Sequence, residues 1–156
     1  MNITADTNVL VRALVADDPA QAAEASRLMR EATTIAVPLP VLCELVWVLK
    51  RVYGFGVADI GAAIRSLLLA GHVRLDRPAV EAGLVLLEAG GDFADGVIAH
   101  QGQWLGGEVF VSFDRQAVAL LQQQGVAAEP IRSDPVDSMP DSNAVGRGSD
   151  PDPSAG

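Results

Sequence analysis

The chain has 156 residues, about half of them hydrophobic, and its apolar stretches fall short of the roughly 18 uncharged residues that a membrane span requires. This length suits one domain with a substantial core. The net charge of −9 argues against a polyanionic partner, but residues 133–156 alone hold five Asp and one Arg, and residues 1–132 set ten Lys or Arg against fifteen Asp or Glu. Composition therefore excludes a membrane protein and leaves a nucleic-acid partner open.

Short β-branched or apolar runs alternate with helical patterns along residues 1–132. In chain order we expect a strand at 2–5, a helix at 9–14 begun by Asp6-Thr7-Asn8, a helix at 20–31, a strand at 34–37, and a helix from Pro38 or Pro40 to Tyr53-Gly54. A helix at 57–70, a strand at 72–75, a helix at 78–89, a helix at 96–105 capped by Asp92, a strand at 109–113, a helix at 115–124 and a strand at 126–131 follow. Strands alternating with helices predict a mostly parallel sheet covered on both faces.

The end of the chain differs from this pattern. Residues 133–156 are rich in Asp, Ser, Pro and Gly, which cannot supply a hydrophobic core. We therefore expect one domain at 1–132 and an acidic, disordered tail at 133–156.

Glu44 stands out within the segment PVLCELVWVL at residues 40–49, where every other residue but the proline is apolar. Its helical neighbours three and four positions away are a Pro, two Val and a Trp. A carboxylate in apolar surroundings is costly unless it is paired or binds a metal. We therefore expect Glu44 to bind a metal ion or, as the alternative, a buried Arg. Trp47, Trp104 and Phe113 are expected in the core.

Three further acids fall where strands end or helices begin. Asp6 follows the first strand and Asp114 follows the strand at 109–113, and the carboxyl ends of parallel strands share one edge of a sheet. If the helices bearing Asp95 and Glu44 begin at the same edge, the four carboxylates converge and repel one another unless a cation is bound. Magnesium and manganese prefer such hard oxygen ligands. The alternative is that each Asp, including Asp92, only caps a helix N-terminus.

Four segments carry a family likeness: ADTNVL at 5–10, PVLCELVW at 40–47, DFADGVIA at 92–99 and VSFDR at 111–115. In this order and spacing they resemble the PIN-domain ribonucleases, and most of all the VapC-type toxins of bacterial toxin–antitoxin pairs. The likeness spans residues 1–131. It implies a three-layer α/β/α fold, a magnesium- or manganese-dependent endoribonuclease that cleaves RNA, a homodimer, and inhibition by a VapB-type antitoxin.

The resemblance also assigns roles by position. It implies that the catalytic and metal-binding residues are Asp6, Glu44, Asp95 and Asp114. The supporting polar residues are Thr7, Asn8, Asp92 and Ser112. Contacts to backbone phosphates are expected from Arg12, Arg115, Lys50 and Arg51. The acidic tail has no counterpart in the family pattern.

Other functions share part of this chemistry. A metal-dependent DNA nuclease or phosphatase would use the same carboxylates, and a non-catalytic PIN-like binding module would use them only as caps or ion pairs. A phosphorylated signalling receiver needs a Lys near the last strands, but the only lysine, Lys50, lies in a predicted helix.

Cysteine usage indicates the compartment. The single Cys43 excludes an intramolecular disulfide and a cysteine-based zinc site, and it has no activating neighbour in the sequence. The N-terminus shows no basic segment followed by an apolar one, so we expect no secretory signal. These features favour the cytoplasm.

Overall fold

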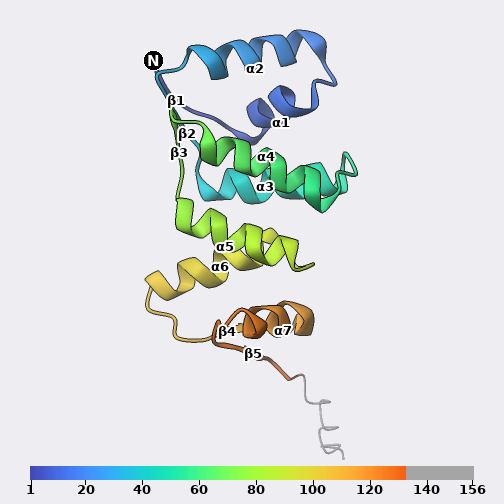
Figure 1. The fold of residues 1–156 in the computed structure, drawn as a ribbon, viewed down its shortest axis with the longest axis vertical. Coiled ribbons are helices and arrows are strands. Elements are labelled where there is room, and N and C mark those ends of the chain that lie inside the picture. The colour runs from blue at the N-terminus through green and yellow to red at the C-terminus, as the bar shows by residue number, and fades with distance from the viewer. Residues whose placement is uncertain (133–156) are drawn as a thin grey trace, which may run out of the picture.

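Residues 1–132 are described by the computed structural model of the chain, and they form seven helices and five strands (Figure 1). The helices are α1 (Thr7–Val15), α2 (Pro19–Glu31), α3 (Leu39–Arg51), α4 (Val57–Leu69), α5 (Arg77–Glu88), α6 (Phe93–Trp104) and α7 (Arg115–Gln123). The strands are β1 (Asn2–Thr4), β2 (Thr34–Ala36), β3 (Val73–Arg74), β4 (Phe110–Ser112) and β5 (Ala128–Pro130). Every predicted element is present, with ends shifted by a few residues. The predicted disordered tail at 133–156 lies outside the described residues.

Most of these helices begin directly after an aspartate. In each case the carboxylate accepts a hydrogen bond from a backbone N–H of the first turn, and the residues are Asp6, Asp18, Asp76, Asp92 and Asp114. Such a cap satisfies an amide that has no partner inside the helix. Asp6, Asp92 and Asp114 therefore cap helices, which leaves open whether they also bind a cation.

All strand pairs are parallel, as predicted. β1 pairs with β2 and β2 with β3, whereas β4 pairs only with β5. Parallel strands with intervening helices confirm the predicted α/β class and agree with a three-layer α/β/α fold. Hydrogen bonds nevertheless divide the strands into sheets of three and two rather than one central sheet.

Two hydrophobic cores account for this division. The larger one lies around β1–β3 and includes Leu84 and Leu87 of α5. The smaller one joins Leu86 and Ala99, from α5 and α6, to α7 and β5. Successive helix pairs lie along the long axis of the molecule, α1 with α2, α3 with α4 and α5 with α6, followed by α7 with β4 and β5 (Figure 1). The α5–α6 pair thus separates the two sheets.

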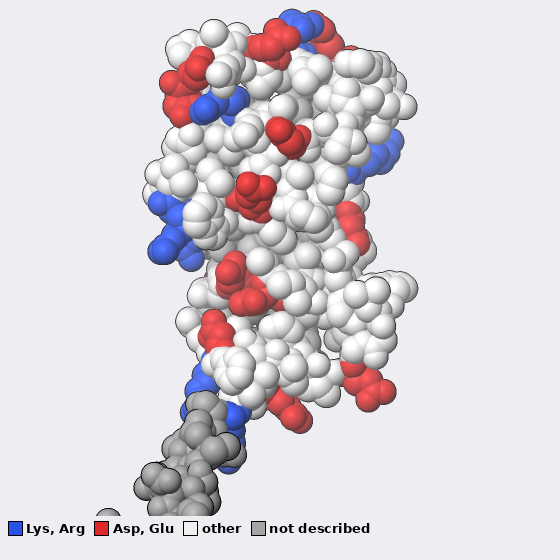
Figure 2. Space-filling model, turned by 180° about the vertical axis from the view of Figure 1, so that it is seen from behind, with Lys and Arg blue, Asp and Glu red and all other residues white. Residues whose placement is uncertain are grey.

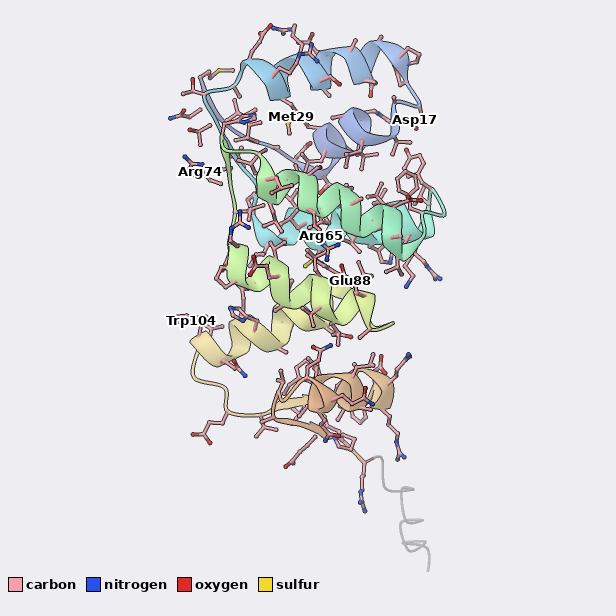
Figure 3. The ribbon with its side chains drawn as sticks, viewed as in Figure 1. Asp17, Met29, Arg65, Arg74, Glu88 and Trp104 are labelled. Carbon is pink, nitrogen blue, oxygen red and sulfur yellow. The ribbon has the colours of Figure 1, made fainter. Side chains whose placement is uncertain are left out.

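Two glycines let α5 and α6 touch backbone to backbone. A Cβ added at Gly96 would lie 2.6 Å from the carbonyl oxygen of Ala82, and one at Gly83 would lie 2.7 Å from the ring of Phe93. The neighbouring contact between α4 and α5 includes the exposed Arg65–Glu88 ion pair (Figure 3), which adds little stability. Close packing against α5 therefore fixes the position of α6. Within residues 1–132, the helices are all too short or too polar to cross a membrane.

Candidate functional site

A pocket of about 360 Å³ lies where α3, α6 and α7 meet. Its lining comprises Val46, Trp47, Lys50, Arg51, Leu87, Gly90, Gly91, Asp92, Asp95, Asp114, Gln116 and Ala117. Acidic groups come from α6 and α7, and cationic groups come from the last turn of α3. The pocket therefore places carboxylates and basic side chains around one space.

Local hydrogen bonds hold the acids of this pocket. Asp92 caps α6 by accepting from the backbone N–H of Ala94 at 3.1 Å. The carboxylate of Asp114 caps α7 by accepting two backbone N–H bonds, at 3.0 and 3.1 Å. The backbone N–H of Asp114 in turn donates to the hydroxyl oxygen of Ser112 at 3.0 Å. Ser112 thus contacts the backbone of Asp114, and its supporting role at the site stays a prediction.

The negative charges of Asp92 and Asp114 act on the carboxyl group of Asp95. Burial, together with the nearby carboxylates of Asp92 and Asp114, raises the pKa of Asp95 above its ordinary value. Like charges raise a carboxyl pKa because the second negative charge is harder to form beside the first. A cation among these three groups would relieve the repulsion.

A second acidic group forms around the start of α1. The buried hydroxyl of Thr7 donates to Glu44 Oε2 at 2.8 Å, and the carboxylate of Asp6 accepts from the backbone N–H of Val9 at 2.9 Å. Asp6 and the exposed Asn8 line a different, shallow depression beside Arg12. Thr7 therefore connects Glu44 to the segment that follows β1.

The expectation that Glu44 lies in apolar surroundings is wrong, because its side chain is exposed. The buried face of α3 consists of Leu39, Leu42, Leu45, Val46 and Leu49. Helical periodicity places Glu44 on the opposite stripe. The alternative of a buried Arg partner also fails, since within residues 1–132 Glu44 has no ion pair and its partner is Thr7.

The donor set fits a divalent cation in its chemistry, because it consists of hard, mutually repelling carboxylates. The acids are not arranged as a ready-made ligand set, since within the described part of the chain His, Cys, Asp and Glu side chains do not close together in a group of three or more. Figure 2 shows acidic side chains spaced along this face rather than gathered at one point. The structure thus brings Asp92, Asp95 and Asp114 to one pocket and joins Glu44 to Thr7, the residue that follows Asp6. Their expected common edge is missing because β1 and β4 belong to different sheets.

Sequence reasoning missed Trp47. It was expected in the core, but 58% of the residue is exposed, and Trp104 and Phe113 are exposed too. The exposed residues of α3 fall at Pro40, Glu44, Trp47, Lys50 and Arg51, a helical stripe that the sequence contained.

The remaining predicted groups are placed as follows. Arg12 is bound to Asp17 at 2.6 Å, so it is less available to phosphates than was expected. Arg115 is exposed at the start of α7. Burial and the charge of Asp92 raise the pKa of Cys43, which is half-buried against the larger core, so its thiol is unreactive.

A family model described as PIN domain matches residues 3–120. No curated protein matches the chain. The matched span contains every predicted site residue and both acidic groups.

Proposed function

The chain belongs to the PIN domain family, and from this premise we propose that it is a magnesium- or manganese-dependent endoribonuclease. PIN domains are generally nucleases that bind nucleic acid and use divalent metal ions. The observation that carries the proposal is the shared pocket of Asp92, Asp95 and Asp114 beside Lys50 and Arg51.

In this proposal Asp95 and Asp114 hold the cation with Asp92, and Asp6 and Glu44 act from the neighbouring group. A magnesium or manganese ion bound there would polarise the scissile phosphate and activate a water for attack. Thr7 orients the carboxylate of Glu44 by donating to it, and Ser112 holds the backbone N–H of Asp114 at the start of α7.

The basic side chains bind the substrate backbone. Lys50 and Arg51 line the pocket, and within residues 1–132 neither forms an ion pair. Arg115, at the first position of α7, is exposed next to Asp114. Phosphate contacts of this kind contribute most of the sequence-independent affinity for nucleic acid.

Cleavage mapping on total RNA, with and without chelator, tests the activity. Asp95→Asn should abolish metal-dependent cleavage, whereas the matched control Asp59→Asn should retain it, because Asp59 is an exposed acid on α4 outside the pocket. Parallel assays with DNA and with a phosphomonoester distinguish the DNA nuclease and phosphatase alternatives. Undiminished cleavage by Asp95→Asn would refute the assignment.

A non-catalytic PIN-like binding module is the second candidate. It is favoured by the capping bonds of Asp6, Asp92 and Asp114 and by the open arrangement of the acids. Calorimetric titration separates the two functions: no binding at millimolar magnesium would favour the module.

We further propose that the protein is a VapC-type toxin that acts in the cytoplasm and is inhibited by a VapB-type antitoxin. The four segments that resemble these toxins support this, and exposed apolar residues such as Leu69, Val85 and Leu105 offer surface for an antitoxin or a homodimer partner. Expression should arrest growth, and co-expression of the adjacent reading frame should relieve the arrest. Light scattering measures the oligomeric state.

A further inference from the structure

The solvent-facing stripe of α3 holds one large aromatic side chain between charges of opposite sign. Trp47 lies one helical turn after Glu44 and one helical turn before Lys50 and Arg51. The side chain lies in no core cluster, and 58% of the residue remains exposed. Trp offers a large rigid apolar face at low conformational cost, so an exposed Trp in a pocket indicates a binding position.

The pocket around Trp47 has the charge and size for one nucleotide. Lys50 and Arg51 lie on the same wall, and neither is paired with a carboxylate within residues 1–132. The volume of about 360 Å³ is near the lower end of small-ligand pockets, which span about 300–1,000 Å³. The pocket therefore has room for a single base and not for the width of a duplex.

We propose that Trp47 stacks on one unpaired base of the RNA while Lys50 and Arg51 contact the adjoining phosphates. This inference rests on the proposed function and adds to it a residue that positions the substrate. Trp47 is a positioning residue: it holds a base on α3 so that the neighbouring backbone passes the carboxylates of α6 and α7.

Stacking explains physically why the base must be unpaired. Bases inside a duplex are already stacked and paired, whereas loops and single strands expose their π-faces to protein aromatics. Removing one such aromatic weakens binding by about 5- to 150-fold. Because every base has a π-face, we expect tolerance of base identity at this position.

Fluorescence titration tests the contact directly. The parent protein is the full chain carrying Asp95→Asn, to prevent cleavage, and Trp104→Phe, so that Trp47 is the sole indole of a chain with two Trp. Trp104 lies at the C-terminal end of α6, away from the pocket, and bonds only to His100 (Figure 3). The probes are a mixed-sequence RNA oligonucleotide and the same strand annealed to its complement, both in chelator.

The single strand should quench the fluorescence of Trp47, and the duplex should not. Trp47→Ala and Trp47→Leu should weaken single-strand binding about 5- to 150-fold, and Trp47→Phe should restore most of it. The matched control Trp104→Ala, made in the Asp95→Asn chain, should bind like its parent. Equal affinity of the Trp47→Ala or Trp47→Leu chain and its parent, or equal quenching by duplex, would overturn the inference.

The two proposals fail separately. If the wild-type chain cleaves no RNA but binding depends on Trp47, the nuclease proposal fails and the stacking contact stands. If the wild-type chain cleaves single-stranded RNA and Trp47→Ala leaves its KM unchanged, the stacking contact fails and the nuclease proposal stands.

Discussion

The substitution Gly96→Ala tests how the position of α6 is set. The new Cβ would lie 2.6 Å from the carbonyl oxygen of Ala82 and 2.9 Å from the Cα of Gly83. Overpacking costs about 1–3 kcal/mol, and backbone atoms cannot rotate away, so we take the upper end. Alanine recovers about 1 kcal/mol of helix propensity. We therefore expect a net loss of about 2 kcal/mol in the free energy of unfolding, and weaker RNA cleavage because Asp92 and Asp95 move with α6.

Gly102→Ala is the matched control in the same helix. A Cβ at Gly102 meets no atom within 4 Å, so only the propensity gain of about 0.5–1 kcal/mol remains. Urea denaturation followed by circular dichroism measures both variants. Opposite signs are expected, and a Gly96→Ala chain as stable as the Gly102→Ala chain would refute the close α5–α6 contact.

Three further perturbations address the site. Thr7→Val removes the hydrogen bond to Glu44 and should lower the free energy of unfolding by about 1–1.5 kcal/mol. In urea denaturation, a double-mutant cycle with Glu44→Ala should show a coupling energy of about 1 kcal/mol between the two residues. Strictly additive effects of the two substitutions would contradict the contact. Asp114→Ala removes the cap of α7 and should lower the free energy of unfolding by about 1–2 kcal/mol. Asp114→Asn keeps an oxygen that can cap the helix, so it should retain most of the stability but lose RNA cleavage. Equal destabilisation by the two substitutions would contradict the capping role. The pKa of Asp95 is raised in the folded chain, so its proton favours folding below the unfolded pKa of about 3.9, and that contribution is lost as pH rises through the folded pKa. Asp95→Asn should therefore raise the Tm at pH 7 by a small amount, limited by solvent screening, and leave the Tm unchanged below about pH 4. A Tm equal to that of the wild type at pH 7 would count against repulsion between Asp95 and the carboxylates of Asp92 and Asp114.

Local signals explain why the elements could be predicted. Asp114 precedes a helix and bonds its first amides, and Gly125 ends the same region with a positive φ of 81°. Both effects involve only neighbouring residues. The parallel pairing of β1 with β2 follows from the intervening helices.

Effects between distant residues could not be derived in the same way. The positions of Gly83 and Gly96 in the sequence do not predict that they meet, because their contact forms only when α5 packs against α6. Asp6 and Asp114 each end a strand, but strand order decides whether the two strands share an edge, and here they lie in separate sheets. The apolar neighbours of Glu44 indicated burial, yet periodicity places Glu44 and Trp47 on the exposed stripe.

The central claim is that the carboxylates of α6 and α7 hold a divalent cation in the pocket beside α3. Anomalous diffraction from crystals of the chain soaked in manganese tests this most directly. We predict a manganese peak among Asp92, Asp95 and Asp114 that disappears in Asp95→Asn. A peak elsewhere, or no peak at a manganese concentration that supports RNA cleavage, would contradict the claim.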